Sequence, residues 1–314
     1  MVRKCDKCQR FALVHHHPLA PLTAIHSPLP FATWGMDILG PLPKATGQRK
    51  YLLVAVDYFT KWVEAEAVAS ITEHEVRKFI WKNIITRFGV PQAIIFDNGR
   101  QFDTDKLRDY CAGYGIQTRY TAVARPQTNG QVESTNKQIL SGLKKRLDAA
   151  KGSWADELPA ILWSIRTTEK SATGETPFML VYGSEAVLPV ELAIRTHRTT
   201  TFQTAQNNQA LREALDLLPL VRGDAYLREE IAKARMARFY NQRVRERPLA
   251  VGDLVLWKME AIRKGASQGK LTPNWEGPYI VYEEIRPGTY QLQTLQGVEV
   301  PRAWHSQNLR RYFV

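Results

Sequence analysis

Between Thr33 and Leu147 the sequence alternates short apolar runs with segments of helical periodicity. The runs at 33–39, 51–58 and 93–96 are typical of strands, the second of them buried. Capping boxes at Thr72 and at Thr128 predict the starts of two longer helices, the first ending near Gly89. A shorter helix near 104–114 and a strand near 118–121 lie between them. This order predicts a layered α/β domain.

The rest of the chain has a different sequence pattern. The sequence predicts a helix from Trp154 to Arg166, and then a charged helical region over 205–247 with interruptions at Pro219 and Gly223. Short β-like runs follow, and their spacing predicts a small all-β barrel of about 65 residues. These runs are 253–257, 279–282, 289–293 and 298–300.

The charge balance favours acidic partners. Lys and Arg number 43 against 31 Asp and Glu, which gives a formal net charge of +12 and favours nucleic acid as a partner. No apolar run approaches the ~18 residues of a membrane helix, and the amino terminus has no signal-peptide pattern. Three cysteines, two of them in one Cys-x-x-Cys, fit a reducing compartment or a metal site. We therefore expect a soluble intracellular protein with no membrane partner.

Three carboxylates can meet at one end of the predicted sheet. Asp37 lies in the first strand, Asp97 ends another strand, and Glu133 lies one turn into the second capped helix. Such a triad suits two divalent cations, and hard oxygen ligands favour Mg²⁺ or Mn²⁺ over zinc. The alternative is that each Asp is an ordinary turn or cap residue, because 31 acids offer many such triples.

The helix that carries Glu133 also carries cations on the same side. Lys137 and Lys144 follow Glu133 by one and three turns, where a nucleic-acid backbone can lie. The adjoining stripe is apolar and predicts the buried face. The alternative is a solvated face with a favourable Glu-to-Lys pair.

At these residues the chain resembles retroviral and gypsy-type retrotransposon integrases. The resemblance rests on Asp97-Asn98-Gly99 and on the stretch from Gln127 to Lys137, with 35 residues between Asp97 and Glu133. Trp34-Gly35-Met36-Asp37 and Val56-Asp57-Tyr58 are similar to the first two strands of that family. The segments Gly174-Glu175-Thr176-Pro177-Phe178 and Trp275-Glu276-Gly277-Pro278-Tyr279 are similar to the end of its core and to its Gly-Pro-Tyr module.

The resemblance implies a ribonuclease-H-like core, a mixed five-stranded sheet with flanking helices, plus a small Src-homology-3-like barrel. It implies that Asp37, Asp97 and Glu133 bind two Mg²⁺ or Mn²⁺ ions. The implied reaction is 3′-end processing of the element's DNA, followed by strand transfer into target DNA without a covalent enzyme intermediate. By their place in the motif, Gln127, Asn129, Gln131 and Lys137 contact the DNA end.

The chain departs from the family at its amino terminus. Family members carry a zinc module with two histidines before a Cys-x-x-Cys, whereas here Cys5 and Cys8 have no room for histidines ahead of them. The zinc site is therefore incomplete, and we interpret His15 to His17 as solvated linker residues. The chain resembles an integrase truncated at its amino terminus, and thus a piece of a longer polyprotein.

The other differences from the family's motifs do not affect the three expected metal ligands. Where gypsy-type relatives have His-Pro-Gln-Thr-Asp-Gly-Gln, this chain has Arg125 and Asn129 in the two variable places, and Arg125 keeps a potential phosphate contact. Asp57 and Asp103 are the nearest rival carboxylates, and we favour a structural role for Asp57. We interpret Cys111 as a buried apolar residue rather than a nucleophile.

Basic residues near the carboxyl end form a second candidate DNA surface. The run from Lys233 to Arg247, which includes Arg243 and Arg245, is either a solvated helix or a contact to nucleic-acid backbones. In the barrel, four aromatic residues are core candidates: Trp257, Trp275, Tyr279 and Tyr290. Four residues are expected to be exposed and to touch nucleic acid or chromatin: Arg302, His305, Arg310 and Arg311.

We divide the chain into a remnant zinc module and linker (1–26), a catalytic core (27–190), a helical linker (191–248) and a barrel (249–314). The favoured function is integration of element DNA by a homo-multimer, since two DNA ends must be joined to one target. That work places the protein in the nucleus, and otherwise in a cytoplasmic particle. The alternatives are a catalytically silent relic that binds DNA or assists assembly, and a cut-and-paste transposase or related nuclease.

Overall fold

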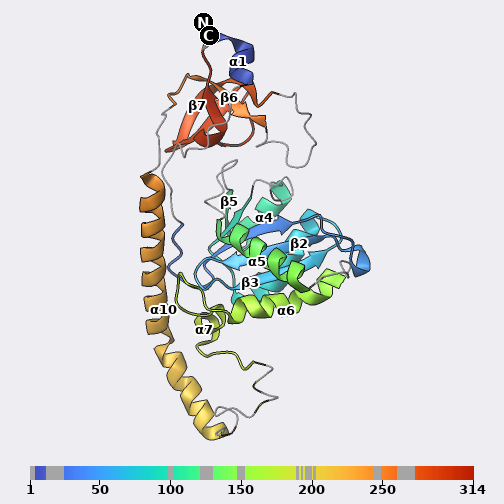
Figure 1. Ribbon diagram of the computed structural model, residues 1–314, viewed down its shortest axis with the longest axis vertical. Coiled ribbons are helices and arrows are strands. Elements are labelled where there is room, and N and C mark those ends of the chain that lie inside the picture. Colours follow the sequence, from blue (N-terminus) through green and yellow to red (C-terminus); the bar gives the residue numbers. More distant parts are fainter. Residues whose placement is uncertain are drawn as a thin grey trace. The chain divides into compact units, whose positions relative to one another are not determined.

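The structure is a computed structural model in which the described residues are 4–11, 25–97, 102, 104–120, 130–146, 153–188, 191, 194, 200, 203–242, 249–259 and 273–314. They form two compact units (Figure 1). The described residues of 25–120 and 129–233 make up the first, and those of 1–24 and 234–314 the second. We call them the core unit and the barrel unit.

The core unit is built on a mixed five-stranded sheet. Its order is β3-β2-β1-β4-β5, in which the β1–β2 and β2–β3 pairs are antiparallel and the β1–β4 and β4–β5 pairs are parallel. Its strands are β1 (Thr33–Leu39), β2 (Tyr51–Asp57), β3 (Val63–Val68), β4 (Ala93–Phe96) and β5 (Gln117–Tyr120). The sequence analysis predicted four of these strands and missed β3, whose mixed Val-Glu-Ala-Glu-Ala-Val pattern has no sustained apolar run.

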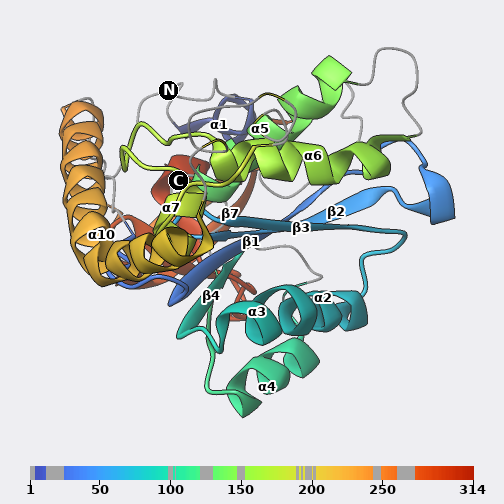
Figure 2. The same cartoon turned by 90° about the horizontal axis from the view of Figure 1, so that it is seen from below.

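Helices cover both faces of this sheet (Figure 2). One face carries α2 (Glu73–Phe79), the π-helical turn η3 (Ile80–Ile85), α3 (Thr86–Phe88) and α4 (Asp105–Gly113). The other carries α5 (Gly130–Arg146) and α6 (Trp154–Thr167), and α7 (Pro177–Tyr182) follows α6. The predicted cap of the first helix is confirmed, because the Thr72 side chain accepts a hydrogen bond from the Glu75 amide.

The two faces of the sheet have separate hydrophobic layers. Trp34 and Met36 pack under α2 and α4, with Ile94 and Phe96 of the neighbouring strand. The alternate residues of β2 pack under α5 and α6 with Val132 of α5. Because side chains alternate along a strand, Gly35 and Asp37 belong to the face that α5 covers.

The helix α10 (Thr204–Asn241) runs without a break through Pro219, so the expected interruption at Pro219 and Gly223 is wrong. A proline removes one helical hydrogen bond. Here the face that includes Leu218 and Ala225 is buried, and this packing keeps the helix continuous. Within the described residues, no helix has the length and apolarity needed to cross a membrane.

The barrel unit contains a five-stranded antiparallel sheet of order β10-β6-β7-β8-β9. Its strands are β6 (Leu254–Lys258), β7 (Trp275–Arg286), β8 (Thr289–Gln293), β9 (Trp304–His305) and β10 (Leu309–Arg311). The strand expected at 298–300 is wrong, since only a single bridge joins Glu299 to Gln293. The segment lies between a turn at Gly297 (φ 81°) and Pro301, which has no backbone N–H to extend a strand ladder.

The short helix α1 (Asp6–Arg10) packs on this barrel. Its Gln9 side chain donates to the Phe313 carbonyl and accepts from the Phe313 amide, both at 2.8 Å. The Asn274 amide donates to the Arg10 carbonyl at 3.0 Å. The amino-terminal segment is therefore part of the barrel unit.

Candidate active site

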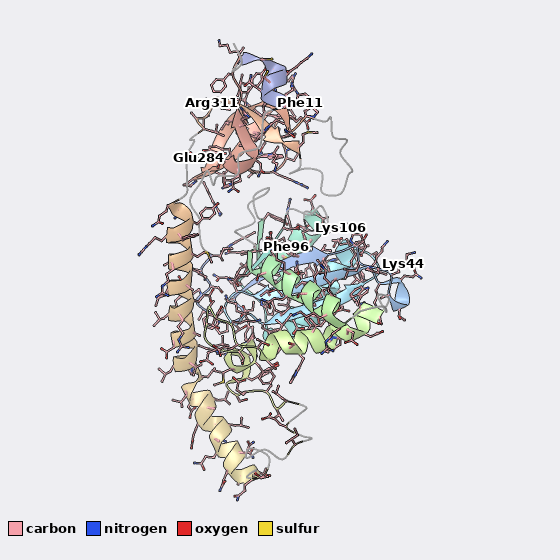
Figure 3. All side chains as sticks on the ribbon, viewed as in Figure 1. Phe11, Lys44, Phe96, Lys106, Glu284 and Arg311 are labelled. Carbon is pink, nitrogen blue, oxygen red and sulfur yellow. The ribbon has the colours of Figure 1, made fainter. Side chains whose placement is uncertain are left out.

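Two of the three predicted carboxylates start from neighbouring strands. β1 and β4 pair in parallel, and their last paired residues are Met36 and Phe96, the latter labelled in Figure 3. Asp37 and Asp97 are the next residues, so their backbones are about 5 Å apart, the ordinary spacing of paired strands. By alternation both side chains start on the face opposite Met36 and Phe96, which is the face that α5 covers.

The third carboxylate lies on the helix that packs against this position. A Cβ added to Gly35 would stand 2.6 Å from Cγ2 of Val132, so α5 approaches β1 at a point where only glycine fits. One turn later Asn136 Nδ2 donates to Asp37 Oδ2 at 2.8 Å. Glu133 stands between Val132 and Asn136 on α5. Residues about a hundred positions apart along the chain, 99 for Asp37 and Asn136, thus meet on one face of the sheet.

The donor chemistry of this site fits a hard divalent cation. Asp37, Asp97 and Glu133 are each partly exposed, so a cation can reach their oxygens. Asp37 Oδ1 accepts from its neighbour's amide, that of Ile38, at 2.8 Å, while Asn136 Oδ1 is buried without a hydrogen-bond partner. Among the residues that the structure describes, no three His, Cys, Asp or Glu side chains are grouped to hold a metal ion. The carboxylates share a face of the sheet without forming a preassembled cluster.

The rival carboxylate Asp57 has the structural role that the sequence analysis favoured. It is fully buried and accepts hydrogen bonds from the Phe31 amide at 3.0 Å and from the amide and hydroxyl of Thr60 at 2.8 and 2.7 Å. Burial raises the pKa of Asp57 to about 6, against the lowering effect of these donors. The other rival, Asp103, lies outside the described residues, as do Asn98, Gly99 and His15 to His17.

The predicted DNA contacts of the core fall into three groups. Arg125, Gln127 and Asn129 lie outside the described residues. Lys137 and Lys144 are exposed on α5, as a contact to a DNA backbone requires. Gln131 instead bonds inside the protein: it accepts from Lys61 Nζ at 2.9 Å and donates to Glu229 Oε1 at 3.4 Å.

The sequence analysis missed Lys61, Asn136 and Glu229. For Asn136 the signal was present, because a residue three positions after Glu133 lies on nearly the same side of the helix. Nothing in the sequence pairs Lys61 with Glu229, since 168 positions separate them.

In the barrel unit, one of the four residues expected at the surface is buried. His305 is fully buried, so its expected exposure is wrong; it lies in the short strand β9, paired with Thr289 of β8. Arg311 is exposed, as expected, and pairs with Asp253. Arg243 and Arg245 lie outside the described residues, and Arg302 is exposed and Arg310 partly exposed.

The barrel's aromatic residues are at its core, as expected. Trp275 and Tyr290 are buried, and Trp257 and Tyr279 pack partly buried against the hydrophobic cluster that contains Tyr290. The rings of Trp257 and Tyr279 stack with centroids 4.0 Å apart.

The three cysteines separate into two kinds. Cys5 and Cys8 are both exposed at α1. Hydrogen bonds from Cys8 lower the pKa of the Cys5 thiol. Cys111 is buried, which raises the pKa of its thiol to about 11 and confirms that it is a packing residue rather than a nucleophile.

Comparison with known proteins agrees with this geometry. Residues 27–126 match the family model described as integrase core domain, and residues 249–313 match a domain of unknown function (DUF8803). The Transposon Tf2-3 polyprotein of Schizosaccharomyces pombe is 27% identical over 319 residues, which cover 99% of this chain and 23% of the polyprotein. The chain thus spans about a quarter of that relative's length.

One solved structure shares the fold over the whole chain. The intasome of simian T-cell lymphotropic virus, solved in complex with the PP2A regulatory subunit B56 gamma, matches all of this chain and 89% of its own, with a TM-score of 0.58 and 17% identity. The HTLV-2 integrase catalytic core domain in complex with magnesium matches 48% of this chain with a TM-score of 0.40 and 25% identity. The predicted fold class and the resemblance to integrases are confirmed.

Proposed function

We propose that this protein is a retrotransposon integrase that processes the 3′ ends of element DNA and joins them to target DNA. The observation that supports the proposal is that Asp37 of β1 accepts a hydrogen bond from Asn136 of α5, the helix that bears Glu133, while Asp97 directly follows the parallel neighbouring strand β4. Three carboxylates at one edge of a sheet suit phosphoryl transfer assisted by two divalent cations. The match of residues 27–126 to the integrase core domain supports the same reaction class.

In this proposal Asp37, Asp97 and Glu133 hold two Mg²⁺ or Mn²⁺ ions. Cations bound there would polarise the phosphodiester and stabilise the leaving oxygen. Asn136 orients the Asp37 carboxylate through its 2.8 Å hydrogen bond. No covalent enzyme intermediate is required, and the buried Cys111 offers none.

The proposed DNA contacts follow the exposed cations. Lys137 and Lys144 stand on the same helix as Glu133 and would neutralise phosphates beside the reacting bond. We extend the DNA contacts to Arg125, Gln127 and Asn129 in the core and to Arg243, Arg245, Arg310 and Arg311 beyond it. We further propose assembly as a homo-multimer, action in the nucleus, and a chromatin contact through the barrel.

A strand-transfer assay tests the proposal. The full chain is incubated with Mn²⁺, a labelled duplex of the element's end and an unlabelled target duplex. We expect the label to appear in longer products, and Asp97→Asn to abolish them while leaving DNA binding. The matched control is Asp109→Asn, an exposed carboxylate on α4 that should leave transfer unchanged.

The second candidate function is a catalytically silent relic that binds DNA or assists assembly. The observation that favours it is that the carboxylates are not grouped as a metal site in the described part of the chain. Metal-independent DNA binding, with neither cleavage nor transfer at any Mn²⁺ concentration, would establish the relic instead of the enzyme.

A further inference from the structure

One face of α10 is built into the core unit. Leu218, Arg222, Ala225 and Glu229 follow one another at helical spacing, and Leu218, Ala225 and Glu229 are 6%, 1% and 4% exposed. Arg222 Nε donates to the carbonyl of Leu180 in α7 at 2.9 Å. A charged residue at the centre of such a face must have partners, because burying an unpaired carboxylate is costly.

The partners of Glu229 are two lysines and a glutamine. Lys61 Nζ and Lys233 Nζ lie 2.7 and 2.9 Å from Glu229 Oε1, and Gln131 Nε2 donates to the same oxygen at 3.4 Å. We call these four residues the Lys61 cluster. They come from the turn after β2, from the start of α5 and from α10.

The hydrogen-bond donors of the two lysines are fully used. The Lys61 ammonium donates to Glu229, to Gln131 and to the Tyr58 carbonyl, which accounts for its three hydrogens. Lys233 donates to Glu229, to Glu230 and to the Ile25 carbonyl ahead of β1. Burial lowers the pKa of Lys61, and the neighbouring Glu229 opposes that effect. The burial of each charged group therefore depends on the others as its partners.

Gln131 connects this cluster to the candidate active site. It is the second residue of α5 and stands two positions before Glu133. The first amide groups of a helix have no partners inside the helix, so its first turn frays unless side chains hold it. The Gln131 side chain is held at both ends, by Lys61 on its oxygen and by Glu229 on its nitrogen.

We propose that Glu229 is a positioning residue: through Lys61 and Gln131, α10 fixes the first turn of α5 and so the place of Glu133. The catalytic meaning of this arrangement rests on the proposed function, whereas the hold on α5 does not. Gln131 is then a structural tie, and it can contact DNA only by leaving the cluster. The segment from Leu218 to Lys233 is accordingly part of the catalytic unit rather than a passive linker.

Hydrogen exchange of the full chain, without DNA or metal, tests the hold on α5. The amides of residues 134–137 are the first in α5 with helical acceptors, so they report the closure of its first turn. Glu229→Gln keeps the size of the side chain and removes its charge, and should speed exchange of these amides about tenfold. The matched control is Glu213→Gln, an exposed residue of the same helix, which should change nothing.

Two results would overturn the proposal. Unchanged exchange at residues 134–137 in Glu229→Gln would show that the cluster does not hold α5. An equal increase in α5, in α6 and in the strands of the core sheet would show that Glu229 supports the fold in general. Should Glu229→Gln fail to fold, Gln131→Ala replaces it, since that change leaves the Lys61–Glu229 pair intact and should still loosen residues 134–137.

A kinetic readout separates this inference from the proposed function. Because Glu229 is buried and is not itself a proposed DNA contact, Glu229→Gln should lower kcat for strand transfer about tenfold and leave the KM for DNA unchanged. An increased KM with normal kcat would count against positioning. If the wild-type chain transfers no strands, the proposed function fails, and the exchange experiment still decides whether α10 holds α5.

Discussion

Gly35 sets the distance between α5 and the sheet. A Cβ at this position would stand 2.6 Å from Val132 Cγ2 and 3.0 Å from the Tyr58 ring and its hydroxyl. Glycine inside a strand often marks such a close approach of another backbone. The distance between Glu133 on α5 and Asp37 on β1 therefore depends on a residue that carries no chemistry.

Gly35→Ala should destabilise the core unit by about 1–3 kcal/mol, because the added methyl overpacks the contact with Val132. Urea unfolding of the full chain measures the change. Adding Val132→Ala should recover part of the loss by making room. Gly113→Ala is the control, since its Cβ would meet nothing within 4 Å. Wild-type stability in Gly35→Ala would contradict the close approach.

The buried Asp57 predicts a pH dependence of the unfolding free energy. Its pKa rises from 3.8 to about 6 on folding, so the folded chain binds more protons than the unfolded chain between these values. The contribution of Asp57 to stability is therefore present at low pH, and about 3 kcal/mol of it is lost as the pH rises through about 6.

Comparison with Asp57→Asn isolates this contribution from those of other carboxylates. The unfolding free energy of the wild type, minus that of the variant, should fall as the pH rises from 4 to 7. Urea titrations at several pH values measure both. A difference that is constant or rises with pH would show that Asp57 is ionised throughout, held by the donors from Phe31 and Thr60.

Individual residues also show how much of the site can be predicted from the sequence. Asp37, Asp97 and Glu133 could be named from motif and spacing, because strand pairing and a capped helix bring them to one face of the sheet. The contact between Lys61 and Glu229 could not, because it depends on where α10 packs. A sequence pattern within one helix or strand predicts which of its faces is buried. It does not predict which distant segment packs against that face.

At the scale of the element, α5 divides its surface between packing and charge. Val132, Ile139 and Leu143 are buried, whereas Lys137 and Lys144 are exposed. This agrees with the apolar stripe expected from periodicity alone. The exposed cations leave one side of the helix open to a polyanion.

Lys137→Ala and Lys144→Ala should each weaken DNA binding without regard to sequence. Each should reduce the slope of log affinity against log salt by about 1, because each removes one phosphate contact. Fluorescence anisotropy over a series of salt concentrations measures the slope. Lys106→Ala, an exposed lysine on α4 on the other face of the sheet, is the control (Figure 3). An unaltered slope in both α5 variants would show that α5 does not contact DNA.

Local sequence signals predicted most helices and strands. They failed where tertiary packing determines the local structure. The cap at Thr72 and the run before Asp97 fixed a helix and a strand near their observed bounds. Pro219 predicted a break in α10, yet burial of Leu218 and Ala225 keeps that helix whole. The short strands β9 and β10 were missed because two or three residues carry no periodicity.

At the scale of the whole molecule, the observed units differ from the division made from sequence. Residues up to Lys233 group with the core unit, whereas the sequence analysis ended the catalytic core at 190. The short helix α1 groups with the barrel through Gln9 and Phe313. Both differences arise from contacts between segments far apart in sequence, which composition and linkers do not reveal.

This grouping predicts the behaviour of fragments. A fragment of residues 25–233 should unfold cooperatively and be more stable than one of residues 25–190 by at least about 2 kcal/mol, since burying a side chain such as Leu218 contributes about 1.5–3 kcal/mol. Urea unfolding compares them. A fragment ending at 212 retains the start of α10 without its docked face and should resemble the shorter one. Equal stability of all three would mean that α10 adds nothing to the core unit.

The central claim is that Asp37, Asp97 and Glu133 together bind divalent metal. Mn²⁺ titration of the full chain, with free Mn²⁺ followed by electron paramagnetic resonance, measures this directly and needs no DNA. We predict that Glu133→Gln and Asp37→Asn each remove Mn²⁺ binding, while Asp109→Asn, on the opposite face of the sheet, retains it. Binding that is undiminished in Glu133→Gln and Asp37→Asn would contradict the account.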